Sequence, residues 1–166
     1  MRRLETAGIS IVAIDGACTG VDFERALEAD IRIAAERATF SADGARDLAA
    51  CALRLTRLLG EARAKEIVLG LRSFDAAMAL RLGIVTRVVP TTELAATGDA
   101  LVERLAALPP LALPAIRDAV CAARDLTPDR ALAVEHTHFR RLIATSDHKA
   151  AVEAFFERRP AVFTGE

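Results

Sequence analysis

Long apolar runs are missing from this sequence. No stretch approaches the roughly 18 to 20 consecutive apolar residues that a membrane-spanning helix needs, although 52% of the residues are hydrophobic. The first residues, MRRLETAG, also lack the apolar block of a secretory signal peptide. These absences argue against a membrane protein and predict a cytoplasmic location.

Cysteine and lysine are scarce. The three cysteines, Cys18, Cys51 and Cys121, are widely spaced and form no C-x-x-C pair. Neither a disulfide framework nor a zinc site is therefore indicated, and we expect small buried side chains. Lys65 and Lys149 are the only lysines among many arginines, which we attribute to coding bias.

No excess of either charge is present. The chain has 22 Lys and Arg against 23 Asp and Glu, for a formal net charge of -1. This balance gives no electrostatic reason to expect nucleic acid or an anionic membrane surface as a partner. With 166 residues the chain has the ordinary size of one domain and can bury a real core.

What the sequence does contain is a run over residues 9–40 that is typical of a strand, a glycine turn, a helix and a second strand. The apolar residues from Ile9 to Ile14 predict a buried strand, which Asp15-Gly16 ends. Gly20 precedes a helical pattern, and residues 31–34 predict the second strand. The helix has an apolar side and a charged side: Phe23, Ala26 and Leu27 on the first, Glu24 and Glu28 on the second.

The rest of the chain is mainly helical by pattern. The expected elements are a short extended piece at 39–41, helices at 48–59, 61–69 and 76–82, a strand at 84–89, and helices that begin near 91, 128 and 146, the last ending near 158. We expect the first seven or eight residues to form part of a helix that leads into the first strand. The simplest division is an α/β core at 1–90 and a helical region at 91–166 that serves oligomerisation.

Three segments carry a family resemblance. IDGACTGVDFERALEADIRIA resembles I-N-G-x-A-x-G-G-G-x-E-L-A-L-x-C-D-I-R-I-A, the core signature of the enoyl-CoA hydratase/isomerase (crotonase) family. LRLTRLLGEARAKEIVLGLRSFDAAMALRLGIVTRVVP and the ending FFERRPAVFTGE resemble later motifs of that family, in the same order. The resemblance covers nearly the whole chain from about Ala7. It implies an α/β, partial crotonase-like fold, in which a few-stranded sheet is followed by a largely helical C-terminal extension.

The resemblance also implies a reaction on an acyl thioester, whose carbonyl oxygen gains negative charge as an enolate forms. Two preorganised N–H donors stabilise such an oxygen. The family's G-G-G turn falls on Gly20, Val21 and Asp22, so the resemblance implies that Gly20 contributes to substrate binding and that the backbone N–H of Val21 is one donor. The branched side chain of Val21 disfavours a positive φ, and the Asp22 carboxylate opposes an oxyanion. The alternative is that this turn has only a structural role and does not bind an oxyanion.

Glu24 stands where the family has its first catalytic glutamate, and the resemblance implies an acid/base role for it. The alternative is a solvated helix carboxylate. The second family glutamate falls on Gly44 and is therefore absent; the flanking Asp43 and Asp47 could replace it only if the loop is rearranged. The loop that follows is about four residues shorter than in the family. The family's other oxyanion donor lies in an N-terminal portion without a counterpart here, so we expect a partner chain to supply it.

The ending contains further candidates. Arg158 and Phe163 match positions that in the family help to hold the nucleotide part of CoA, commonly across a subunit boundary; an ordinary solvated tail is the alternative. No metal site is expected, because His136 and His138 are two residues apart and do not share a helical face. Cys18 is expected in the core, with a lowered pKa at a helix N-terminus as the alternative.

Two functions remain open from the sequence. The first is an enzyme of fatty acid metabolism that acts on an acyl thioester of CoA or of a carrier protein by hydration, dehydration or double-bond isomerisation. It would need no cofactor beyond the CoA thioester substrate, and isomerisation or dehydration is favoured because a single carboxylate is available. The second is a catalytically impaired binding or scaffold subunit. In either case we expect a homo-oligomer, a trimer or hexamer, or a complex with a second crotonase-like chain.

Overall fold

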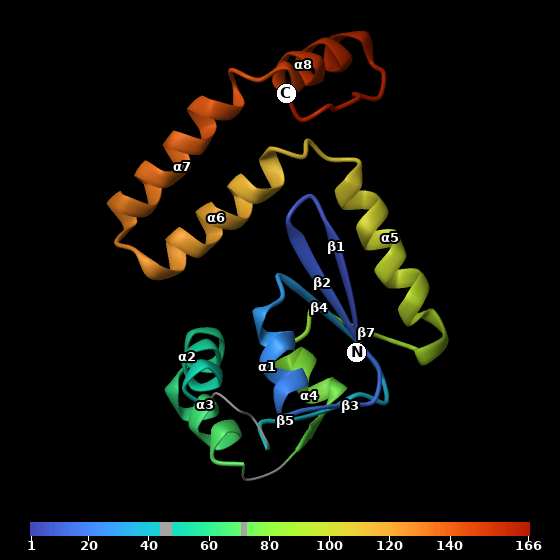
Figure 1. The fold of residues 1–166 in the computed structure, drawn as a ribbon, viewed down its shortest axis with the longest axis vertical. Helices are drawn as coiled ribbons and strands as arrows, with labels where there is room; N and C mark the ends of the chain where they lie inside the picture. Colours follow the sequence, from blue (N-terminus) through green and yellow to red (C-terminus); the bar gives the residue numbers. More distant parts are fainter. Residues whose placement is uncertain (44–47, 71–72) are drawn as a thin grey trace. The chain divides into compact units, whose positions relative to one another are not determined.

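The computed structural model describes residues 1–43, 48–70 and 73–166. The chain divides into two compact units (Figure 1): residues 1–5 with 10–100, and residues 6–9 with 101–166. The first unit contains the strands that form the sheets, and the second contains the helices that follow residue 100.

A four-stranded sheet has the order β1-β2-β4-β7, with β2 at Ile9–Ile14 and β4 at Ile31–Ala35. β2 and β4 are parallel, with Ile11 paired to Ile31, and α1 (Val21–Glu28) lies between them in the chain. All six residues of β2 are buried. A parallel strand covered on both faces reads as a continuous apolar run, so this buried strand is confirmed.

The first residues form a strand and not the helix that we expected. β1 (Arg2–Thr6) is joined to β2 by the turn Ala7–Gly8, whose φ values of 46° and 74° are the two positive values of a type I′ hairpin turn. A helix this short is not stable alone, whereas pairing with β2 satisfies the backbone groups of β1. The edge strand is also anchored by its side chains, because Arg2 Nη2 lies 3.1 Å from Asp99 Oδ1.

A second sheet has the order β3-β5-β6, with β3 at Ala17–Thr19, β5 at Thr39–Ser41 and β6 at Phe74–Asp75. β3 runs parallel to β5, and β5 runs antiparallel to β6. We did not expect β3 or β6, since two or three residues are too few to show an alternating pattern. The extended piece at 39–41 is confirmed.

The strand expected at 84–89 is shorter in the structure, where β7 covers Arg87–Val89. Ile84 and Val85 are buried, but both donate their N–H groups to the carbonyl oxygen of Ala79, at 2.9 and 3.3 Å. These two bonds continue the end of α4 (Ala76–Arg81). Pairing with β4 therefore begins only after them.

Most of the remaining helices agree closely with expectation: α2 (Leu48–Leu59), α3 (Glu61–Val68), η1 (Thr91–Glu93) with α5 (Leu94–Ala106), α7 (Pro128–Leu142) and α8 (Ser146–Glu157). No separate helix start was expected for α6 (Ala112–Asp125), which follows Pro109-Pro110. None of the helices in the described parts of the chain is long and apolar enough to cross a membrane. The core of the first unit contains an aromatic cluster of Phe23, Phe40 and Phe74, whose ring centroids lie 5.5 to 6.2 Å apart. α1, β5 and β6 are packed together by this cluster.

In the second unit α6 and α7 pack against each other. Arg117 of α6 donates to the carbonyl oxygen of Gly8, at 2.7 Å from Nη1. α7 contains no buried residue. Its apolar side chains are therefore left partly in contact with solvent.

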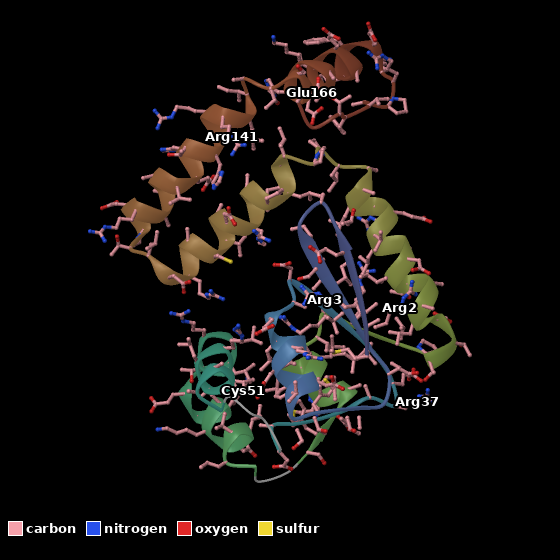
Figure 2. The ribbon with its side chains drawn as sticks, viewed as in Figure 1. Arg2, Arg3, Arg37, Cys51, Arg141 and Glu166 are labelled. Atoms are coloured by element: carbon pink, nitrogen blue, oxygen red, sulfur yellow. The ribbon has the colours of Figure 1, made fainter. Side chains whose placement is uncertain are left out.

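An exposed ion pair joins the ends of β2 and β4. Asp15 follows β2, and Arg37, labelled in Figure 2, follows β4. Arg37 donates from Nε to Asp15 Oδ1 and from Nη2 to Asp15 Oδ2, both at 2.6 Å. These hydrogen bonds lower the pKa of Asp15 below its usual value.

We predict that Arg37→Gln raises the pKa of Asp15, measured by NMR titration of its carboxyl group. Because the pKa is lowered in the folded protein, the pair stabilises the fold above the unfolded-state pKa of Asp15, and this contribution is lost as the pH falls through the folded-state value. The difference in urea midpoint between wild type and Arg37→Gln should therefore shrink in acid. Arg87→Gln, which removes another exposed arginine, is the control; an unchanged Asp15 titration in Arg37→Gln would contradict the assignment.

Candidate functional site

The turn before α1 takes its unusual conformation at Gly20. Gly20 has φ 54° and ψ -124°, the values of the first central residue of a type II′ turn, where glycine is strongly favoured. Val21 begins α1 and is half-buried. The only non-glycine residues with positive φ in the described ranges are Ala7 and Arg158. The strain expected at Val21 is therefore absent, because Gly20 supplies the positive φ.

The N–H of Val21 is one of the first four of the helix, which have no acceptor within the helix. It lies in the first turn, where the helix dipole places partial positive charge. Its neighbour Gly20 also accepts a backbone bond from the N–H of Glu24, at 3.1 Å. Val21 can thus act as a fixed backbone donor to an anion.

The Gly20 turn follows β3, and residues 42 and 43 follow β5, at the same end of the second sheet. Thr19 pairs with Ser41 in the parallel β3–β5 ladder, so both strands end there. Asp43 donates its N–H to Ser41 Oγ at 3.0 Å. Its carboxylate faces the end of α3, since Oδ1 lies 2.7 Å from the position that a Cβ on Gly70 would take. Gly44, on which the second family glutamate falls, and Asp47, one of the two aspartates that flank it, lie outside the described residues.

Two carboxylates on α1 differ in their surroundings. Glu24 is half-buried and lies three residues after Val21, on the same side of the helix, whereas Asp22 is exposed. Helical side chains lean toward the N-terminus, which directs Glu24 toward the turn. The structure thus brings together Gly20, Val21 and Glu24, and keeps the charge of Asp22 in solvent.

Cys18 is a core residue, as expected. It is fully buried on β3. Burial, and to a smaller extent the negative charge of Asp22, raises the pKa of its thiol to about 12. The lowered pKa considered as the alternative is wrong, because loss of hydration outweighs the helix dipole. Cys51, labelled in Figure 2, is also buried, whereas the expectation of burial is wrong for the exposed Cys121 on α6.

The far end of α1 is fixed by a residue that we did not single out. Arg32 on β4 donates from Nε to Ile84 O at 2.5 Å, and from Nη1 to Ala29 O and to Ala26 O, the latter at 3.5 Å. Burial lowers the pKa of Arg32. The available signal was an arginine four residues after the end of an amphipathic helix, because a cation near a helix C-terminus can bond to the last carbonyl groups.

A matching contact joins the two central strands. Asp30, just before β4, accepts from Ser10 N at 2.8 Å and from Ser10 Oγ at 2.7 Å, and Asp30 N donates to Ser10 Oγ at 3.1 Å. Ser10 is buried. These bonds set the start of β4 beside the start of β2.

Arg158 and Phe163 belong to the second unit. Arg158 is exposed and ends α8 in the left-handed conformation, with φ 54° and ψ 39°, and Phe163 is half-buried. The segment around them is not a freely solvated tail, because Thr164 N and Gly165 N donate to the buried carboxylate of Asp147. In the described residues no group of three or more potential metal ligands lies together.

Comparison with known proteins decides the family. The model of the enoyl-CoA hydratase/isomerase family matches residues 2–166. The chain belongs to this family. Its α/β, crotonase-like fold is confirmed by solved members of the enoyl-CoA hydratase/isomerase family. Enoyl-CoA hydratase subunit I of Geobacillus kaustophilus superposes with a TM-score of 0.86 at 37% identity, over 94% of this chain and 62% of that one.

Other relatives agree. The enoyl-CoA hydratase of Bacillus anthracis has a TM-score of 0.88 at 29% identity, over 96% of this chain and 64% of that one. The short-chain-enoyl-CoA hydratase of Clostridium acetobutylicum is 32% identical over 163 residues, which are 95% of this chain and 62% of that protein. The chain therefore spans somewhat less than two thirds of the length of these enoyl-CoA hydratases.

Proposed function

We propose that the chain acts on an acyl thioester of CoA or of a carrier protein, by enoyl hydration, dehydration or double-bond isomerisation. The observation that carries the proposal is the Gly20 turn, which leaves the N–H of Val21 at the N-terminus of α1 as a donor to an enolate oxygen. Family membership supports the same substrate class, because the matched relatives are named as enoyl-CoA hydratases.

Glu24 is the proposed acid/base. Its half-buried side chain leans toward the turn, so a thioester whose oxygen meets Val21 has its adjacent carbon atoms near this carboxylate. A single carboxylate can remove a proton from one carbon and return it to another. We therefore favour isomerisation or dehydration over hydration, which needs a second group to hold the water.

A catalytically impaired binding or scaffold subunit is the second candidate. The observation that favours it is Asp22, whose negative charge contributes to the raised pKa of Cys18 and so acts near the turn. The same charge opposes an oxyanion there. A chain that binds CoA without turning over any enoyl thioester supports this candidate.

We further propose that the second unit assembles with other copies of the chain. Its helices and final segment carry many exposed apolar side chains: Ile116, Val120, Leu132, Phe139, Ile143, Val152, Phe155, Phe156 and Val162. Phe155 and Phe156 are 79% and 78% exposed and contact each other edge to face. Soluble proteins rarely leave so many apolar groups uncovered.

Val21→Pro is expected to lower kcat on crotonyl-CoA about 100-fold, the usual effect of losing one oxyanion donor. Proline removes the N–H and is well accepted at the first residue of a helix. Val21→Ala, which keeps the N–H, is the control and should retain the rate. Wild-type turnover by Val21→Pro, with unchanged circular dichroism, would show that Val21 is not the donor.

Glu24→Gln is expected to lower kcat by about 10² to 10⁴, because the amide keeps the shape of the side chain but cannot transfer a proton. Glu28→Gln is the matched control on the same helix, where Glu28 is exposed and lies 3.3 Å from Arg54. Exposed pairs of this kind contribute little. Equal loss in both variants would point to damage of α1 and against catalysis by Glu24.

Replacing both Phe155 and Phe156 by Glu is expected to reduce the native mass measured by light scattering to that of one chain. Two charges in a desolvated interface are unfavourable. Leu69→Glu is the control, because Leu69 is 71% exposed and lies in the first unit. A wild-type chain that is monomeric at micromolar concentration would refute the assembly.

A further inference from the structure

Asp147 is a buried carboxylate whose partners all lie in the final segment of the chain. Only 3% of its surface is exposed, although it sits in the first turn of α8. Its Oδ1 accepts from Thr164 N at 2.7 Å, and its Oδ2 accepts from Gly165 N at 3.1 Å. In the opposite direction, Asp147 N donates to Glu166 O at 3.2 Å.

The cap of α8 is a different residue. Thr145 accepts from the N–H of His148 through Oγ1, at 3.2 Å, as an N-cap residue does. Asp147 is therefore not needed to start the helix. Its hydrogen bonds hold residues 164–166.

The segment 158–166 is thus fixed at both ends. At the end of α8, Arg158 is in the left-handed conformation, and Arg158 N and Arg159 N donate to Phe155 O and Ala154 O at 3.3 and 3.1 Å. The chain then turns back along α8 and ends beside its first turn (Figure 1). Gly165 has φ 82° where the segment meets Asp147.

The held segment presents a cation and an aromatic ring. Arg159 pairs with Glu157, whereas Arg158 is exposed and forms no ion pair with a described residue. Phe163 is half-buried, so its ring has a restricted orientation. A guanidinium suits a phosphate group, and an aromatic ring suits the face of a base.

We propose that Asp147 is a positioning residue, which holds segment 158–166 so that Arg158 and Phe163 receive the phosphate-bearing nucleotide end of a CoA thioester. The proposal rests on the function proposed above. Ordering a segment of nine residues costs conformational entropy. Because Asp147 already orders the segment in the free protein, this entropy is not lost again when the substrate binds. Preorganisation of this kind raises affinity and leaves the chemical step unchanged.

The first test measures the clamp without any substrate. In Asp147→Asn and Asp147→Ala, hydrogen exchange of the Thr164 and Gly165 amides should become at least about tenfold faster, because a charged acceptor is lost. Asp129→Asn, an exposed aspartate in the first turn of α7, is the control. Unchanged exchange in the Asp147 variants would overturn the clamp.

The second test separates positioning from a general loss of structure. For crotonyl-CoA, KM should rise about tenfold in Asp147→Asn, the size of one charge-assisted contact, with kcat within about twofold. For crotonyl-pantetheine, which lacks the nucleotide, both constants should match wild type. A fall in kcat on both thioesters, or an unchanged KM for crotonyl-CoA, would overturn the positioning role.

The proposal also has a readout that does not require turnover. Calorimetry with CoA itself should show affinity about tenfold lower in Asp147→Asn than in wild type and in Asp129→Asn. If wild type turns over neither thioester, the enzymatic function fails, and this affinity difference still decides the role of Asp147. Equal affinity in all three proteins would overturn it.

Discussion

The half-buried side chain of Arg32 holds the far end of α1, and the proposed site depends on that helix. Its hydrogen bonds reach Ala26 O in the last turn of the helix, which also accepts from Ala29 N, and Ala29 O just after the helix. The bond to Ile84 O ties the same side chain to the chain after α4. α1 has eight residues and is about 12 Å long, so a tilt at Arg32 would move the N–H of Val21 at the other end.

Asp30 and Arg32 act together on the register of the central strands. Asp30 bonds to Ser10 on β2, and two residues later Arg32 bonds to the carbonyl groups of α1. Both contacts require the observed pairing of Ile11 with Ile31. A slip of one residue would turn every side chain of β4 to the opposite face and separate both sets of partners. Polar groups thus select one arrangement of an otherwise apolar α/β core.

The long periodic elements could be predicted from the sequence, and the short ones could not. The apolar run of β2 and the helix that stops at Gly60 are strong local signals. β1 has two arginines and only partial burial, so the hairpin partner that stabilises it is not visible locally. The turn glycine and the glutamate of the candidate site were predictable from family motifs. Asp147 was not, because its partners lie 17 to 19 residues further along the chain, a pairing that only the path of the folded segment creates.

Val21 and Asp22 replace the second and third glycines of the family's G-G-G turn. This replacement changes the charge near the turn more than it changes the backbone geometry. Only Gly20 needs a positive φ, so Val21 and Asp22 fit the helix without strain. A carboxylate about 6 Å from an oxyanion would raise the energy of that oxyanion by about 0.7 kcal/mol in water, and by about 3 kcal/mol at an effective dielectric constant of about 20. These values correspond to a rate lower by roughly threefold to 100-fold. Because Asp22 is exposed, water screens its charge toward the smaller value. The proposed oxyanion donor, Val21 N–H, is therefore compatible with a solvated Asp22, whereas burial of Asp22 by a bound partner would oppose it.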